Sequence, residues 1–124
     1  MAQGLRLRQR LALVRRAHQF APKTKVLQVA DLTLDRELLE VRRGGEAIKL
    51  TAKELAILEL LMGAPGRVFS RTRILNQVWG YSEDPLTNVV DVYIARLRRK
   101  IDPPGSEPLL ETVRGHGYRL KAAN

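Results

Sequence analysis

The spacing of hydrophobic and polar residues changes several times along the chain. Between Val26 and Leu50, the segments VLQVADLTLD, ELLEVRR and EAIKL alternate apolar and polar positions in part. Such alternation over a few residues is typical of half-buried β-strands. Gly44 and Gly45 separate the last two segments, which indicates a hairpin turn. The pattern predicts a small antiparallel sheet of four strands ahead of any core helix.

A helix is predicted directly after this sheet. Thr51 and Glu54 have the T-x-x-E spacing of a capping box, and Leu50 precedes them in the position of a hydrophobic staple. The helix carries an apolar stripe and ends in the sequence GAPG. The stripe consists of Leu55, Leu58, Leu61 and Met62.

Two further helices and a hairpin complete the predicted order of elements. Ser70 is a good N-cap for a helix that ends near Trp79, and the polar sequence GYSEDPLT follows. The third helix should run from about Asn88 to Ile101, where DPPG stops it. The segments PLLETV and YRL then form a hairpin around two glycines.

The third helix has two contrasting faces. At 100° per residue, one narrow stripe is apolar and should face the core; it comprises Val90, Ile94, Leu97 and Ile101. The opposite face carries Arg96 and Arg99 beside Val92 and Ala95. Long donors next to small apolar groups suit a surface that contacts base edges in the major groove. A solvated basic face is the alternative, but the neighbouring helix and hairpin favour a DNA-binding helix-turn-helix.

The sequence TVRGHGYRL, residues 112–120, is compatible with a phosphate loop, a metal site or a tight turn. The chain has no G-x-x-x-x-G-K-[ST] sequence that would support a phosphate loop. Its only other histidine is His18 and it has no cysteine, so a metal site is disfavoured. We therefore expect a turn with positive φ at Gly115 and Gly117 and an exposed His116.

Composition limits the remaining possibilities. A chain of 124 residues supports one domain, and no apolar run is long enough for a membrane span. No secretory signal is evident, and the absence of cysteine fits a reducing cytoplasm. The net charge is +9, but residues 1–25 hold seven Lys/Arg and no acid. DNA binding by the rest of the chain must therefore depend on where individual arginines lie.

The N-terminal residues form a separate region. Leu7, Leu11 and Val14 recur at helical spacing within residues 1–19, and APKTK then reads as a linker. We accordingly divide the chain into a basic tail and linker, 1–25, and a folded domain, 26–124.

Several motifs together resemble a known family. The sequences LTAKELAILELLMGAPGRVFSRTRILNQVWG, TNVVDVYIARLRRKID and TVRGHGYRL, in this order, are similar to the DNA-binding effector domain of OmpR/PhoB-type bacterial response regulators over residues 26–120. The resemblance implies an α+β fold: a winged helix-turn-helix with an N-terminal four-stranded antiparallel sheet, a three-helix core and a C-terminal β-hairpin wing. It also implies transcription control in the bacterial cytoplasm by tandem binding to direct-repeat DNA, without a cofactor or metal.

The resemblance also implies partners and residue roles. The partners are double-stranded DNA, a second copy on DNA, RNA polymerase and, in a longer protein, a receiver domain with its sensor kinase. Base-facing candidates are Val92, Tyr93, Arg96 and Arg99, and the wing arginine Arg114 enters the minor groove. Phosphate-backbone candidates are Arg71, Trp79, Asn88, Val89, Arg98, Thr112 and Tyr118. Glu83 and Asp84 lie in the loop that faces RNA polymerase in the family.

Some positions depart from the family or have simpler explanations. Asn88 and Ala95 replace longer basic residues, which implies fewer phosphate contacts. Arg73 replaces an acid, so the capping box on Ser70 lacks its acidic half. Trp79 could simply pack in the core, and Asp91 is expected to pair with an arginine of the domain rather than with a base.

Two alternatives remain open at this point. The tail resembles the last helix of a receiver domain plus a linker, but it could be a basic arm for DNA or an anionic membrane. The whole chain could be a winged-helix protein-interaction module that binds DNA only nonspecifically through the tail. An enzyme is disfavoured, because no nucleophile–histidine–acid set, carboxylate pair or cofactor motif is present.

Overall fold

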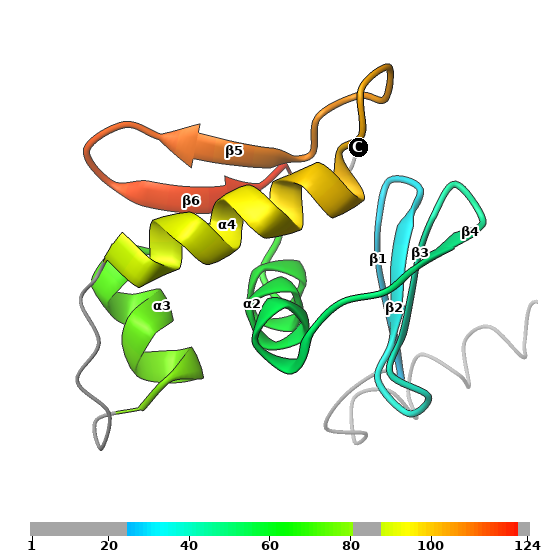
Figure 1. Cartoon of the computed structure of the whole chain (residues 1–124), viewed down its shortest axis with the longest axis horizontal. Coiled ribbons are helices and arrows are strands. Elements are labelled where there is room, and N and C mark those ends of the chain that lie inside the picture. Colours follow the sequence, from blue (N-terminus) through cyan, green and yellow to red (C-terminus); the bar gives the residue numbers. More distant parts are fainter. Residues whose placement is uncertain (1–24, 81–87, 122–124) are drawn as a thin grey trace, which may run out of the picture.

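The computed structural model describes residues 25–80 and 88–121. The described part begins with a four-stranded antiparallel sheet in the order β1-β2-β3-β4, which lies on one side of the helices (Figure 1). The strands are β1 (Val26–Val29), β2 (Leu32–Asp35), β3 (Glu40–Arg43) and β4 (Glu46–Ile48). The predicted sheet is therefore confirmed.

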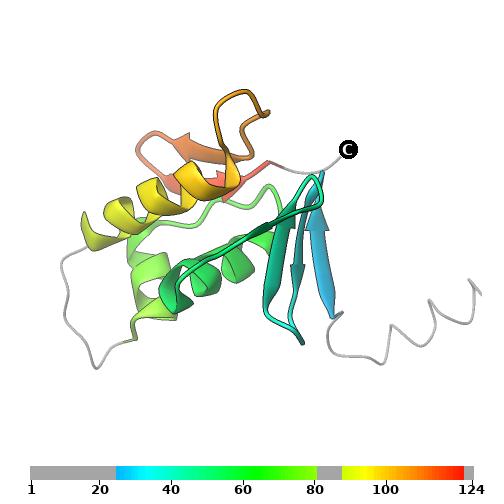
Figure 2. The ribbon, with the colours of Figure 1, turned by 45° about the vertical axis from the view of Figure 1, so that its right-hand side comes forward.

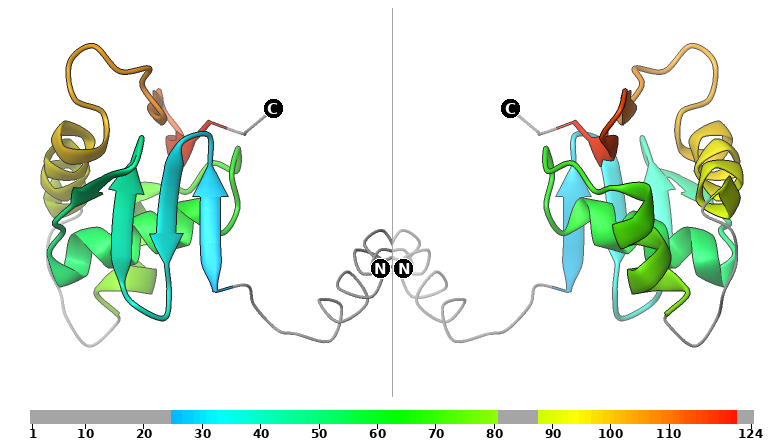
Figure 3. Two further views of the ribbon diagram at one scale, coloured as in Figure 1. Left: turned by 90° about the vertical axis from the view of Figure 1, so that its right-hand side faces the viewer. Right: turned by 90° about the vertical axis from the view of Figure 1, so that its left-hand side faces the viewer.

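One face of this sheet is apolar and packs inward. Leu34 pairs in register with Leu27 on β1 and with Val41 on β3, and Val41 in turn pairs with Ile48 on β4. Partners in register share a face, and this face is turned toward α2 (Ala52–Met62) (Figure 3). Because side chains alternate along each strand, the opposite face carries Gln28, Thr33 and Arg42, together with the exposed Val26.

The third predicted segment of the sheet begins later than its sequence indicates. The segment ELLEVRR was expected to be extended from Glu37, but β3 begins at Glu40. The side chain of Asp35 accepts hydrogen bonds from the backbone N–H groups of Glu37 and Leu38, 2.9 Å each. This carboxylate-capped turn leaves Leu38 and Leu39 exposed rather than in a strand.

Helix α2 begins with the predicted capping box. The backbone N–H of Glu54 donates to Thr51 Oγ1, and the backbone N–H of Thr51 donates to Glu54 Oε1. The predicted stripe is correct in part: Leu55 is only half-buried, and its place in the core is taken by Ile57. The fully buried apolar residues of α2 are Ile57, Leu58, Leu61 and Met62.

Two more helices complete the core: α3 (Arg71–Val78) and α4 (Asn88–Ile101). Ser70 caps α3 by accepting from the backbone N–H of Arg73, 3.0 Å, and the acidic half of a capping box is absent as expected. The inner stripe of α4 is confirmed, since Val90, Ile94, Leu97 and Ile101 are all at most 1% exposed. No helix within residues 25–80 and 88–121 is long and apolar enough to span a membrane.

The C-terminal wing is a hairpin of β5 (Leu110–Val113) and β6 (Gly117–Leu120), which runs beside α4 (Figure 2), while β6 also contacts α2. Gly115 and Gly117 have φ of 79° and 142°, as the turn requires. A Cβ at Gly117 would lie 2.0 Å from the Phe69 carbonyl oxygen. Phe69 and Tyr118 exchange two backbone hydrogen bonds, so glycine at 117 lets the chain before α3 reach β6.

A buried ion pair joins the sheet to the end of α4 and the wing. The guanidinium of Arg43, whose side chain is 8% exposed, lies 2.8 Å from the carboxylate of Asp102, which is 5% exposed. The same guanidinium donates to the carbonyl oxygens of Ile101 and Glu107, and its Nε lies 2.6 Å from Asp31 Oδ1. Asp102 in turn accepts from the backbone N–H groups of Leu109 and Leu110.

We predict that Arg43→Ala lowers the free energy of unfolding by about 3–5 kcal/mol, because it leaves the buried Asp102 carboxylate without its cation. Urea unfolding followed by circular dichroism measures the change. Arg42→Ala is the matched control, since Arg42 is exposed on the opposite face of the same strand. Equal losses for the two variants would contradict the role assigned to the pair.

Candidate nucleic-acid interface

The outer face of α4 is basic and open. Val92 is 46% exposed, and Arg96 and Arg99 are exposed beside it. The opposite stripe is fully buried, which fixes the rotation of the helix about its axis. Three basic residues in the last turn, Arg98, Arg99 and Lys100, also oppose the negative end of the helix dipole. The basic side chains at the end of α4 therefore stabilise the helix that presents them as hydrogen-bond donors.

Aromatic rings support the N-terminal half of this face. Trp79 and Tyr93 meet edge to face, with their ring centroids 5.2 Å apart. The guanidinium of Arg96 lies 5.0 Å from the Tyr93 ring, and the ammonium of Lys53 lies 5.2 Å from the Trp79 ring. Trp79 is half-buried against the core, in agreement with the expectation that it could pack there. Among the described residues its indole N–H has no hydrogen-bond partner.

Asp91 connects three elements at the start of α4. Its Oδ2 lies 3.0 Å from the guanidinium of Arg71 on α3, and its Oδ1 accepts a 2.6 Å hydrogen bond from the Tyr118 hydroxyl on β6. The expectation that Asp91 pairs with an arginine of the domain is confirmed. A phosphate contact from the Tyr118 hydroxyl requires its proton, which is now donated to Asp91.

The environment of Tyr118 perturbs its ionisation. Burial of the hydroxyl, its hydrogen bond to Asp91 and the negative charge of that carboxylate together raise the pKa of Tyr118 to about 12, although Arg71 and Arg98 oppose the shift. The neutral hydroxyl is therefore part of the folded state over the whole physiological range.

A second side-chain bridge joins α4 to the wing. Arg98 donates from Nη2 to the Thr112 hydroxyl, 2.9 Å. Thr112 accepts in this bond, so its own hydroxyl hydrogen is still available to a phosphate. Asn88 is exposed at the first position of α4, while Val89 is half-buried against the core.

The turn of the wing stands next to the start of α3. Arg114 and His116 are both exposed, as expected. An open hollow of about 450 Å³ lies between the wing turn, the N-terminus of α3 and Asp91. The hollow brings together Arg71, Thr112, Arg114 and Tyr118, which come from three separate elements.

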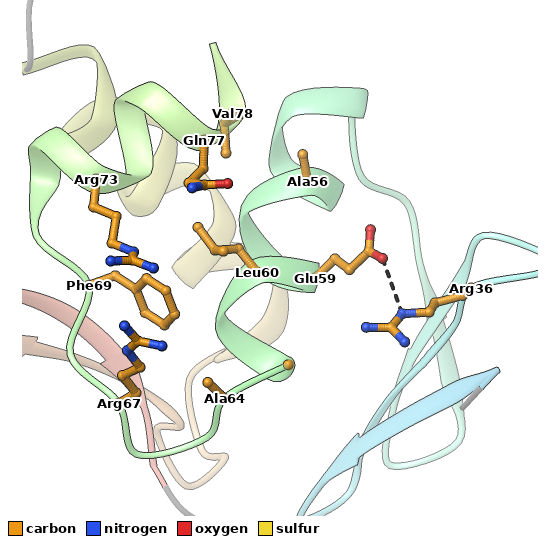
Figure 4. A pocket seen from close by; sticks show the side chains of 11 residues that line it. Arg36, Ala56, Glu59, Leu60, Ala64, Arg67, Phe69, Arg73, Gln77 and Val78 are labelled. Atoms are coloured by element: carbon orange, nitrogen blue, oxygen red, sulfur yellow. Dashed lines mark hydrogen bonds and ion pairs between the residues drawn. The ribbon is translucent and has the colours of Figure 1, made fainter. Parts of the chain in front are cut away.

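Another basic cluster, which the sequence pattern did not predict, lies between α2 and α3. Arg67 and Arg73 stand on either side of the Phe69 ring, 5.2 and 5.6 Å from its centroid (Figure 4). They line a groove of about 540 Å³ whose far side holds the Arg36–Glu59 ion pair, 3.1 Å. The spacing of the two arginines, six residues apart across a helix boundary, gives no sign that they share one ring.

A buried carboxylate also anchors the C-terminal half of α4. Glu54 is 1% exposed and lies 2.7 Å from the ammonium of Lys100. Burial alone would raise the pKa of Glu54, but the hydrogen bonds from Lys100 and Thr51 and the charge of Lys100 outweigh it and lower the pKa. Lys100 is thus fixed by the core rather than being part of the free basic face.

Two of the sequence-based assignments lie outside the described residues. Glu83 and Asp84 fall in residues 81–87, and the basic tail falls in residues 1–24. The other candidate residues lie on α4, at the two ends of α3 and on the wing.

Comparisons with known proteins agree on one family. Residues 45–120 match the family model described as "Transcriptional regulatory protein, C terminal". The chain is 46% identical over 109 residues to the transcriptional regulatory protein TrcR of Mycobacterium tuberculosis, covering 88% of this chain and 42% of TrcR. It is 44% identical over 114 residues to the response regulator MprA of Mycobacterium sp. strain KMS, covering 92% and 50%. The chain thus spans half or less of these relatives.

Solved structures cover the domain more completely. The DNA-binding domain of RstA from Klebsiella pneumoniae, whose crystal structure is a complex with the RstA box, superposes with a TM-score of 0.69 at 31% identity. The match covers 79% of this chain and 98% of that domain.

We predict a late tyrosine titration that depends on Asp91. Because the pKa of Tyr118 is raised to about 12 from 10.0, the stability contributed by its neutral hydroxyl is complete below pH 10 and is lost as the pH rises toward 12. In absorbance titration at 295 nm, the late ionisation should disappear in Tyr118→Phe and move to lower pH in Asp91→Asn. Circular dichroism at each pH checks that the fold persists. A late step that survives Tyr118→Phe would assign it to another group.

Proposed function

The chain belongs to the family of OmpR/PhoB-type response regulators, as a C-terminal DNA-binding domain, and on this basis we propose how it recognises DNA. Domains of this family bind DNA and regulate transcription without being enzymes, and the chain has that function. We propose that α4 enters the major groove and that the wing contacts the adjacent minor groove.

The observation that carries this proposal is the composition of the outer face of α4. Val92 and Arg96 are exposed there, while the same helix buries its opposite stripe completely. In the proposed complex, a guanidinium donates two hydrogen bonds to a guanine, and Val92 contacts a thymine methyl. The remaining base-facing residues are Tyr93 and Arg99.

Phosphate contacts then surround this face. Arg71, the indole N–H of Trp79 and the Thr112 hydroxyl are suited to donate to phosphate oxygens on either side of the groove. Asn88, Val89, Arg98 and Tyr118 complete the proposed phosphate-facing set. Arg114 at the wing turn extends into the minor groove, where a narrow A·T-rich segment concentrates negative potential.

The full-length protein would act through several partners. We propose tandem binding of two copies to direct-repeat sites in the bacterial cytoplasm, control by a receiver domain and a sensor kinase, and contact of Glu83 and Asp84 with RNA polymerase. The competing function, a protein-interaction module, has less support. Interface centres are enriched in large apolar groups, whereas Val92 is the one large apolar side chain exposed on α4.

We predict that Arg96→Ala weakens binding to the preferred site by about 1–3 kcal/mol and relaxes preference at one base position. Fluorescence anisotropy with the preferred and scrambled duplexes measures the ratio of affinities. Arg42→Ala removes the same charge from the outer face of the sheet and should leave that ratio unchanged. An unchanged ratio in Arg96→Ala would remove Arg96 from the base-facing set.

We predict that selection from random DNA enriches a direct repeat with half-sites about one helical turn apart. The preference for the selected site over scrambled DNA should persist at physiological salt, because base contacts depend less on counterion release than phosphate contacts do. Absence of enrichment, with equally steep loss of affinity on every duplex as salt rises, would instead favour nonspecific binding by the basic tail.

A further inference from the structure

The large apolar side chains that remain exposed are unevenly distributed. In the part of the chain that the structure describes they are Val26, Leu38, Leu39 and Val92, which are 48%, 64%, 62% and 46% exposed. Val92 belongs to the proposed DNA-binding face. The other three lie at one end of the sheet, because Val26 pairs with Asp35 and the leucines follow in the β2–β3 turn (Figure 3). We call Val26, Leu38 and Leu39 the sheet-end patch.

Neither solubility nor local backbone geometry favours leucines in this turn. The turn is fixed by the Asp35 carboxylate, which accepts from two backbone N–H groups. Leu39 adopts φ of 57°, a left-handed conformation that L-residues other than Asn and Asp rarely adopt. A glycine or asparagine would cost less there, and it would leave no apolar side chain in water. A partner that covers the patch accounts for both leucines.

The turn that carries the patch is acidic on balance, and the chain enters beside it. Asp35, Glu37 and Glu40 outnumber Arg36 among residues 35–40. The backbone N–H of Arg36 donates to the carbonyl of Lys25, 2.6 Å, and the ammonium of Lys25 lies 3.3 Å from Glu37. The N-terminal segment, residues 1–24, is therefore attached to the domain at the edge of the sheet-end patch.

The sequence of that segment is complementary to the patch. It places Leu7, Leu11 and Val14 at the spacing of one helical face, and it has six basic residues and no acid. The basic residues are Arg6, Arg8, Arg10, Arg15, Arg16 and Lys23. Apolar groups would meet the leucines while arginines meet the acidic rim, and the attachment at Lys25 keeps the two at high effective concentration.

We propose that residues 5–16 dock as an amphipathic segment on the sheet-end patch of the same molecule. This contact places the most basic part of the chain at the end of the sheet, across α2 from the N-terminal half of α4 (Figure 1). Docking thereby withholds the five arginines of residues 5–16 from DNA at the interface. Release of the segment adds phosphate contacts that depend on salt but not on sequence.

The absence of cysteine allows a direct test with a single spin label. In Ala12→Cys, carrying a nitroxide, residue 12 lies away from the face formed by Leu7, Leu11 and Val14. Amide spectra of the ¹⁵N-labelled chain 1–124 should show loss of most signal intensity at residues 35–40, with residues of α4 unaffected. The double variant Leu38→Ser/Leu39→Ser should restore that intensity without shifting amides of the core.

Matched variants separate the possible occupants of the patch. Leu7→Ser/Leu11→Ser changes the segment without touching the folded domain and should also restore the signals at residues 35–40, whereas Val92→Ser should not. Dilution of the spin-labelled ¹⁵N chain with unlabelled chain should leave the broadening unchanged. Broadening that decreases on dilution would assign the patch to a second copy and overturn the proposal, as would undiminished signals at residues 35–40 in the labelled parent.

A DNA-binding measurement tests the consequence independently of sequence recognition. On scrambled duplex at low salt, Leu38→Ser/Leu39→Ser should bind more tightly than the parent, and the slope of affinity against salt should steepen. Equal affinity of the variant and the parent for scrambled duplex would overturn the proposal that docking keeps the arginines of the segment away from DNA. Failure to find a preferred operator would count against the proposed function and leave the spin-label result intact.

Discussion

The buried pair between Arg43 and Asp102 determines where α4 and the wing stand relative to the sheet. A single guanidinium, on the last residue of β3, contacts the end of α4 and the chain that leads to the wing. Asp102 at the same time accepts the backbone N–H groups that open β5. Such a pair adds little to stability compared with an apolar substitute, but it penalises every arrangement that separates its partners. Its main effect is therefore on geometry, because the sheet, α4 and the wing are all positioned by the same ion pair.

Carboxylate side chains connect both ends of α4 to the neighbouring elements. At its C-terminal end, Asp102 and the ion pair between Lys100 and the buried Glu54 bind it to the sheet and to α2. At its N-terminal end, Asp91 links it to α3 and β6. The apolar stripe fixes rotation about the helix axis, and the ionic contacts fix its position along that axis. A helix constrained in this way loses little freedom when its outer face binds a groove, which favours affinity.

The elements with local signals could be predicted from the sequence, and the contacts between them could not. The capping box of α2, the inner stripe of α4 and the glycines of the wing all follow from spacing within a few residues. Arg43 and Asp102 are 59 residues apart, and Glu54 and Lys100 are 46 apart; no period in the sequence connects either pair. The prediction of a strand at Leu38 and Leu39 was wrong because it considered only their apolar character. The hydrogen bonds that the Asp35 carboxylate accepts form a turn there instead.

In the candidate site, too, the individual residues could be predicted but the contacts between them could not. The resemblance to a family supplied the residues of the interface, but it did not indicate how Arg71, Asp91 and Tyr118 share protons and charge. Asp91 places a negative charge beside the surface that is proposed to contact phosphates, which by itself opposes DNA binding. The carboxylate nevertheless holds two donors from different elements in fixed positions, so less conformational freedom is lost on binding. Arg71 can keep one nitrogen on Asp91 and offer the others to a phosphate. The Tyr118 hydroxyl has one proton, which it can donate either to Asp91 or to a phosphate but not to both. Its proposed contribution to DNA binding is therefore more restricted than that of Arg71.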